Sequence, residues 1–198
     1  MWKLCLCILA LGTSMMGQDP FVAPVPALKS PAYDVGLGYD YLVLQDPSAP
    51  GVALNGLDAN GVMKFSPKWA ADIDFSYVRK GNVLGSGRVG YVLNFLAGPE
   101  FYLRRYRSVC TFTHVLVGNG LVDSAVPMNE GFLHGWVSRP SFGIGTGIEE
   151  SFRGPFGVRV YGDYVHTAFA NSFAAVEPQN NFRSVVSFVF RLPFKGKD

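Results

Sequence analysis

The chain has 198 residues, of which 48% are hydrophobic, 16% charged and 14% aromatic. This length suits one domain, and the composition is apolar for a soluble protein of this size. The net charge of +2 comes without a basic patch, which excludes nucleic acid as a partner. Beyond residue 16 no apolar run approaches the ~18 residues of a membrane helix, so the apolar residues are spread over short segments.

Residues 1–17 are typical of a secretory signal peptide, with Lys3 as the positive n-region and residues 4–11 as the apolar h-region. A membrane anchor or a buried helix is the alternative, but the apolar run is shorter than a membrane span. Small residues for cleavage are Gly12, Ser14 and Gly17. The two early cysteines leave with the signal, so Cys110 remains alone and the exported chain has no internal disulfide.

A proline-rich segment follows at residues 18–32. Four prolines remove backbone donors and favour an extended, polyproline-like chain over helix or sheet. We interpret the segment as a tether before the folded domain, with a recognition peptide as the alternative.

Eight stretches of alternating apolar and polar residues predict eight strands, because strand side chains point to opposite faces in turn. The predicted strands are residues 33–44, 52–65, 69–78, 89–102, 109–118, 141–151, 156–168 and 182–192. In the last, Phe182, Phe188 and Phe190 share one face with Leu192, and two arginines lie on the other. Its eleven residues are about what a tilted strand needs to cross the ~30 Å apolar core of a bilayer.

Two strands need separate comment: the fourth for its end and the fifth for its inward face. Pro99 predicts a bend near the end of the fourth strand, where a missing donor is tolerated, and residues 103–108 are predicted to turn the chain. In the fifth strand both faces are mostly apolar, so the lumen side stays open between two sets: Thr111, Thr113, Val115 and Val117, or Cys110, Phe112, His114 and Leu116.

The connections and faces favour a membrane barrel over a soluble barrel of the lipocalin type. Short turns are predicted after the second, fourth and sixth strands and longer loops after the others, beginning with residues 45–51, as in outer-membrane barrels. A soluble barrel needs an exterior rich in Lys and Glu, whereas the polar face here is mostly Gly, Ser, Asn and Asp. The predicted fold is all-β, an eight-stranded antiparallel up-and-down transmembrane β-barrel over residues 33–192, with a tail at 193–198.

Residues 33–192 resemble a known family, most specifically in their final third. The glycine-rich strand at residues 143–149, the run V-R-V-Y-G-D-Y at 158–164, and N-N-F-R at 180–183 leading into F-V-F-R-L are similar to the eight-stranded outer-membrane β-barrels of Gram-negative bacteria, the OmpA transmembrane-domain type. The resemblance implies location in the outer membrane and insertion by the outer-membrane assembly machinery, with Phe190 or Phe194 as the terminal insertion signal. It implies architecture more than activity.

Charged residues gather on the predicted inward faces. They are Asp34, Asp40, Asp58, Lys64, Asp72, Asp74, Glu149, Arg159, Asp163, Arg183 and Arg191. Buried charges require partners, and eight strands leave room only for side chains, so we expect paired charges that fill the lumen rather than a gated ion path. Arg159 and Asp163 are predicted to pair, with Glu149 and Arg183 as cross-strand neighbours.

The three histidines offer weak support for catalysis. Some barrels of this class remove or transfer acyl chains of lipid A with a Ser and a His that act together. None of His114, His134 and His166 has a serine placed in the sequence to match such a pair. No cysteine or histidine cluster has metal-ligand spacing, and no glycine-rich loop suits a phosphate. We therefore expect no enzyme activity, metal or cofactor.

The loop at residues 119–139 is distinguished from the other predicted loops by its apolar residues. Its apolar residues Met128, Phe132, Leu133 and Trp136 predict either a contact with a partner or lipid headgroup, or packing on the barrel mouth. The expected role is structural or surface interaction, with membrane lipids, lipopolysaccharide and an unknown extracellular partner that binds through the long loops. A small-solute or ion channel and a lipid A-modifying enzyme are the alternatives.

Overall fold

A computed structural model of the protein describes residues 32–46, 49–106, 108–123, 127–128, 131–132, 135–152, 154–167 and 179–192. The predicted signal peptide, the tether up to residue 31 and the tail at 193–198 lie outside these residues and stay predictions. Among the described residues, no helix has the length and hydrophobicity needed to cross a lipid bilayer.

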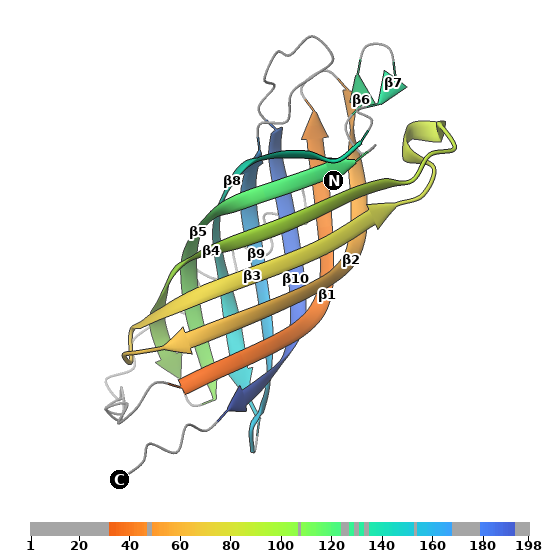
Figure 1. Cartoon of the computed structure of the whole chain (residues 1–198). Coiled ribbons are helices and arrows are strands. Elements are labelled where there is room, and N and C mark those ends of the chain that lie inside the picture. The colour runs from red at the N-terminus through yellow and green to blue at the C-terminus, as the bar shows by residue number, and fades with distance from the viewer. Residues whose placement is uncertain are drawn as a thin grey trace, which may run out of the picture.

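Eight long strands close into one barrel in the order β1-β10-β9-β8-β5-β4-β3-β2, and all neighbours are antiparallel (Figure 1). The strands are β1 Ala32–Asp46, β2 Ala49–Lys64, β3 Trp69–Lys80, β4 Gly90–Tyr106, β5 Val109–Asp123, β8 Val137–Ser151, β9 Phe156–Thr167 and β10 Gln179–Leu192. A separate hairpin of β6 (Pro127–Met128) and β7 (Gly131–Phe132) lies between β5 and β8 in the chain. The predicted eight-stranded up-and-down barrel is confirmed.

The first and last strands close the barrel. Leu37 pairs with Phe188, and Asp34 with Arg191, in the antiparallel ladder between β1 and β10. Closure removes the free strand edges that a lipid core could not hydrogen-bond. The barrel begins and ends at the same end, which we call the terminal end. The turns after β2, β4 and β8 also lie there, and the other connections lie at the opposite loop end.

The first connection is shorter than predicted. β1 extends to Asp46 and β2 begins at Ala49, where the sequence suggested a loop over residues 45–51. The predicted strands end at Leu44 and begin again at Val52, which are buried in an apolar cluster, and the ladder continues beyond this pair to Asp46 and Ala49. The connections after β3, β5 and β9 are longer, as predicted.

β4 also differs from the prediction. It runs unbroken to Tyr106, past the bend expected at Pro99 and the turn expected at 103–108. Pro99 lies in the strand without shifting the register, which instead shifts between Tyr102 and Arg104. A bulge near the rim of a barrel re-aims the side chains that follow it.

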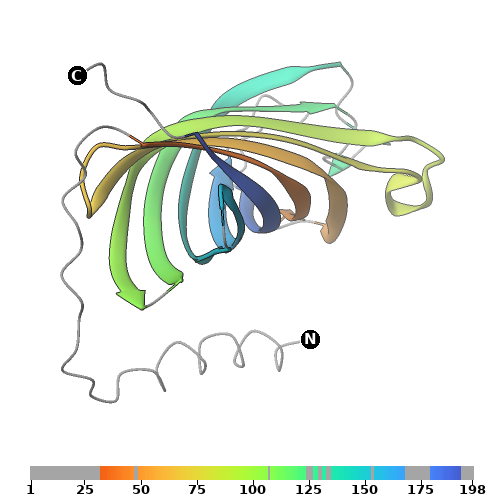
Figure 2. The ribbon, with the colours of Figure 1, turned by 90° about the horizontal axis from the view of Figure 1, so that it is seen from below.

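The hairpin of β3 and β4 projects beyond its neighbours at the loop end and carries a 3-10 helix, Val83–Gly85 (Figures 1 and 2). Asn82 and Leu84 adopt left-handed backbone angles, with φ of 51° and 47°. The Asn82 side-chain oxygen accepts a hydrogen bond of 2.8 Å from the Gly87 amide, and Val83 is fully buried. The loop therefore folds back and places Val83 against the barrel interior.

Candidate functional site: the barrel lumen

The predicted lumen residues do face inward. Ten of the eleven are buried, and the exception is Arg191, whose side chain is 28% exposed at the terminal end. Glu100, His114 and Tyr161 lie in the same interior and contact these charged side chains. Together they form two linked clusters, which we name after their central arginines.

The Arg159 network lies toward the terminal end and consists of Asp34, Lys64, Asp72, Glu100, Glu149, Arg159 and Arg191. Arg159 binds Glu100 with both terminal nitrogens and lies 3.3 Å from Asp72. Lys64 binds Asp34 at 2.5 Å and Glu149 at 3.1 Å. These residues come from seven strands, so the network ties opposite walls of the barrel together.

The Arg183 network lies nearer the middle and consists of Asp40, Asp58, Asp74, Tyr161, Asp163 and Arg183. Arg183 is fully buried and holds Asp74 with both terminal nitrogens, one at 2.7 Å. The Tyr161 hydroxyl donates a hydrogen bond of 2.9 Å to the same carboxylate. Four carboxylates thus surround a single guanidinium.

His114 links the two networks. Its Nδ1 lies 3.1 Å from Asp72 of the Arg159 network, and its Nε2 lies 2.9 Å from Asp163 of the Arg183 network. Both ring nitrogens donate only in the imidazolium form, which is the form that two flanking carboxylates stabilise. His114 is therefore placed as a buried cation, with neither nitrogen free to act as a base toward a serine.

The predicted pair of Arg159 and Asp163 is wrong. Arg159 binds Glu100 and Asp72 instead, and Asp163 binds Arg183 at 3.3 Å together with His114. Arg159 and Asp163 share a strand face, but long side chains reach partners across the narrow lumen. The expected proximity of Arg159 to Glu149 does occur, at 3.8 Å.

Asp72, Glu100 and His114 form a group that resembles a metal site, with one ligand atom each within 4.8 Å of one another. Arg159 already binds both carboxylates of this group, and its guanidinium also stacks 3.8 Å from the centre of the Phe112 ring. The positive charge that a metal would supply is therefore provided by an arginine held in place by stacking.

An apolar plug fills one side of the lumen at the loop end. It consists of Leu42, Leu44, Val52, Leu54, Val78, Val83, Val92 and Val122. Buried polar residues of β9 and β10 fill the other side, where Asn181 donates a 2.9 Å hydrogen bond to Thr167. The charged networks therefore lie below a layer of packed side chains.

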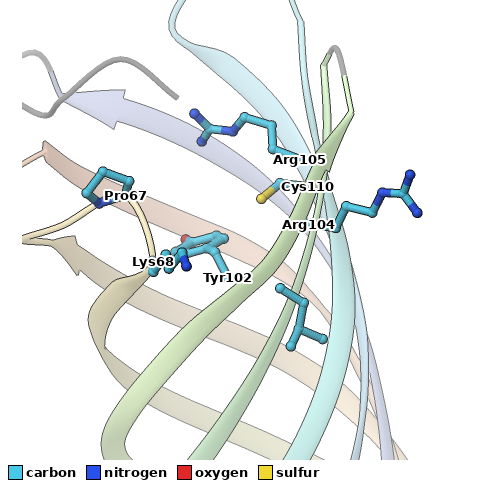
Figure 3. A pocket seen from close by; sticks show the side chains of 7 residues that line it. Pro67, Lys68, Tyr102, Arg104, Arg105 and Cys110 are labelled. Atoms are coloured by element: carbon cyan, nitrogen blue, oxygen red, sulfur yellow. The ribbon is translucent and has the colours of Figure 1, made fainter. Parts of the chain in front are cut away.

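A shallow pocket lies at the terminal end, lined by Pro67, Lys68, Tyr102, Leu103, Arg104, Arg105 and Cys110 (Figure 3). The bulge in β4 directs Arg105 to the side of Cys110 and Arg104 to the opposite side (Figure 3). Lys68 and Arg105 are solvent-exposed, so this pocket is an open, basic mouth. Cys110 is buried and free.

The outer surface is apolar along the middle of the strands. Phe188, Leu57 and Leu37 are 75%, 69% and 66% exposed, while the residues next to them face the lumen. Phe and Trp lie near the terminal end, where Trp69 contacts Phe101 and Phe156 contacts Phe190 at ring distances of 4.8 and 5.5 Å. Aromatic girdles of this kind mark the two interfaces of a membrane barrel.

The loop-end girdle is made mainly of tyrosine. Tyr91 lies between Tyr77 and Trp136, with a ring distance of 6.1 Å to each. Trp136 is half exposed and belongs to the predicted contact loop. The structure describes only the backbone of Met128 and Phe132, in the β6–β7 hairpin, and Leu133 and His134 lie outside the described residues. The contact loop therefore stays a prediction.

The sequence contained signals for the residues that were missed. Glu100 lies on the same face of β4 as the buried Asn94, but the bend expected at Pro99 made the face of the residues after it uncertain. His114 could not be assigned to the lumen from the sequence because both faces of β5 are mostly apolar. In the structure the inward face of β5 carries Cys110, Phe112, His114 and Leu116, all of which are buried.

Solved structures share this fold. Neisserial surface protein A is 10% identical with a TM-score of 0.61, covering 82% of this chain and 99% of that chain. Ail, the attachment invasion locus protein of Yersinia pestis, is 14% identical with a TM-score of 0.52, covering 81% and 98%. The outer membrane protein OprG of Pseudomonas aeruginosa is 9% identical with a TM-score of 0.52, covering 83% and 97%.

No protein-family model matches the chain, and no curated protein matches its sequence. The chain therefore shares the eight-stranded barrel fold of these outer-membrane proteins, as the resemblance in the sequence predicted. The similarity extends to the fold alone.

Proposed function

We propose that the protein is an outer-membrane β-barrel of a Gram-negative bacterium that acts as a closed structural anchor and presents its loop end to the outside. One observation carries the proposal: the middle of the barrel is apolar outside and charged inside. A soluble barrel has the opposite distribution. The fold of the similar structures and the predicted signal peptide support the same location.

The closed lumen favours an anchor over a small-solute or ion channel. The charges inside are engaged in ion pairs that cross the barrel, and packed side chains lie above them at the loop end. An ion path would require these pairs to separate and the plug to move. His114 offers no free base to the lipid A-modifying alternative, because both of its nitrogens face carboxylates.

The proposed partners follow from this placement. Membrane lipids and lipopolysaccharide contact the apolar exterior and its girdles, and the outer-membrane assembly machinery inserts the chain. The loop end is proposed to meet an extracellular partner, with Trp136 as the exposed member of the predicted contact loop. One structure with the same fold is named as a surface protein and another as an attachment invasion locus protein, which supports a role at the cell surface.

Planar-bilayer recording tests the closed anchor. The purified barrel is expected to insert without steady conductance at low voltage. A double variant, Arg159→Ala with Arg183→Ala, serves as the open-lumen comparison if it inserts. Steady pores formed by the unaltered protein would contradict the closed lumen and favour the channel.

A further inference from the structure

The rim of the barrel has a notch at the terminal end, between the β2–β3 turn and the last residues of β4. β3 begins at Trp69, which pairs with Phe101 of β4. β4 continues to Tyr106, and its last residues pair with β5 alone. In the described ladders, the edge of β4 over residues 103–106 therefore has no neighbour on the β3 side. The pocket of Figure 3 lies at this open edge.

The pocket in the notch is lined by cations. Three of its seven lining residues are basic, namely Lys68, Arg104 and Arg105, and none of the seven carries a carboxylate. The buried carboxylates of this end, Asp34 and Glu149, are held by Lys64 and Arg191 instead. They therefore do not offset the exposed charges of the notch.

Hydrogen bonds and the bulge in β4 fix both sides of the notch. The Tyr102 amide donates a 2.9 Å hydrogen bond to the Lys68 carbonyl oxygen, which ties β4 to the β2–β3 turn. Within that turn, the Ser66 hydroxyl oxygen accepts a hydrogen bond from the Lys68 amide at 3.3 Å. The bulge turns Arg105 to the same side of β4 as Tyr102 and Cys110 (Figure 3). Bulges often re-aim side chains in this way beside functional sites.

The notch is continuous with the apolar outer surface. Trp69 and Phe101 contact each other in the girdle of the terminal end, at a ring distance of 4.8 Å. Leu103, two residues further along the same face of β4, is 58% exposed and lines the pocket. Lipid headgroups lie at the level of such a girdle. The notch therefore offers an apolar wall on the membrane side and cations next to it.

We propose that this notch binds the phosphate of an anionic phospholipid, with Lys68 and Arg105 on the phosphate oxygens and Leu103 against the adjoining apolar part of the lipid. The proposal rests on the membrane location proposed above. The pocket has a volume of about 190 Å³, and a water molecule occupies ~30 Å³, so a phosphate group fits.

Two physical reasons favour a lipid as the occupant. Arginine binds phosphate with charge-assisted hydrogen bonds, and basic side chains at a membrane surface attract anionic lipids. A soluble phosphate would meet the same cations but would gain nothing from the exposed Leu103 side chain. Burial of this side chain against lipid adds to the binding free energy.

The test measures lipid preference at the notch with the mature barrel in phosphatidylcholine vesicles. Trp136→Phe leaves Trp69 as the single tryptophan after residue 17, and brominated lipids quench its fluorescence when they lie beside it. Brominated phosphatidylglycerol is expected to bind there at least about tenfold more tightly than brominated phosphatidylcholine.

Two double variants in this background locate the preference. Lys68→Gln with Arg105→Gln is expected to abolish it, and either single replacement serves if the double variant does not fold. Arg79→Gln with Lys80→Gln removes the same charge from exposed side chains at the loop end and is expected to keep it. Heat-dependent gel mobility verifies the fold of each variant.

Three results would overturn the proposal. Equal quenching by the two lipids would show that the notch selects no anionic headgroup. Loss of the preference in both double variants would show that net charge, rather than this notch, attracts the lipid. If inorganic phosphate removes the preference, the occupant is a soluble anion. In each case the barrel is inserted in vesicles, so the proposed membrane location stands, whereas a barrel that does not insert would refute both.

Discussion

Arg183 on β10 and Asp74 on β3 form a two-pronged ion pair across the lumen, with both terminal nitrogens of the arginine on the two carboxylate oxygens. Both side chains are fully buried. β10 and β3 are not neighbours in the barrel, so the pair joins strands that share no backbone hydrogen bonds. Pairs of this geometry are the strongest that arginine makes.

Removing the arginine of this pair is expected to be severe. Arg183→Leu leaves four carboxylates buried without their guanidinium, and breaking a buried pair on one side costs about 3–5 kcal/mol. Arg191→Leu is the matched control, because Arg191 is partly exposed and Lys64 still holds Glu149. Urea unfolding of both variants in lipid vesicles measures the difference. Equal losses would show that the pair contributes nothing beyond a rim contact.

Gly145 is predicted to be irreplaceable beside the histidine link. A Cβ atom added there would overlap an Asp163 carboxylate oxygen and approach His114 Nε2. Gly145→Ala should therefore cost about 1–3 kcal/mol through overpacking. Gly61→Ala should stay within about 0.5 kcal/mol, since a Cβ at Gly61 meets nothing within 4 Å. Denaturation midpoints of the two variants provide the comparison, and a harmless Gly145→Ala would mean that the link is loose.

Leu54 and Leu57 lie on opposite faces of β2. Leu54 is fully buried in the apolar plug, and Leu57 is 69% exposed on the outside. Leu54→Ala should leave a cavity and cost about 2–5 kcal/mol. Leu57→Ala should cost less, because lipid tails fill the space of the missing methyl groups. Thermal unfolding of the two variants in the same lipid tests the plug, which would be refuted by an equal or reversed order.

Phe188 and Val189 are predicted to respond differently to arginine. Phe188 is 75% exposed and Val189 is 2% exposed. Phe188→Arg should cost about 2–4 kcal/mol if its site lies near the bilayer midplane, whereas Val189→Arg acts by crowding the lumen. Vesicle stability measurements compare each variant with the unaltered barrel. A Phe188→Arg barrel of unchanged stability would mean that no lipid surrounds this face.

Much of the barrel was predictable because period-two alternation reports directly on strand faces. Phe182 to Leu192 was assigned to a closing strand, and β10 does pair with β1 over those residues. Strand ends were less accessible. β1 and β2 continue to pair past their predicted ends, as far as Asp46 and Ala49, which the local alternation of residues does not report.

Local sequence patterns also could not predict which charged residues pair inside the lumen. Whether a side chain points inward follows from its odd or even position along the strand. That Arg159 binds Glu100 rather than Asp163, however, depends on the stagger of the strands around the closed barrel. The bulge between Tyr102 and Arg104 has no simple sequence marker. Because of Pro99, the irregularity of this strand was predicted a few residues too early. Local sequence patterns predict turns and strand faces, whereas strand register and ion pairing depend on how the barrel closes.

The central claim is that lipid surrounds this barrel, and heat-dependent gel mobility of the membrane-fractionated protein tests it most directly. We predict that the protein occurs in the outer-membrane fraction and that unheated and boiled samples migrate differently, because the folded barrel resists detergent until it is heated. A chain that instead folds as a soluble monomer without detergent, with one mobility before and after heating, would contradict the account.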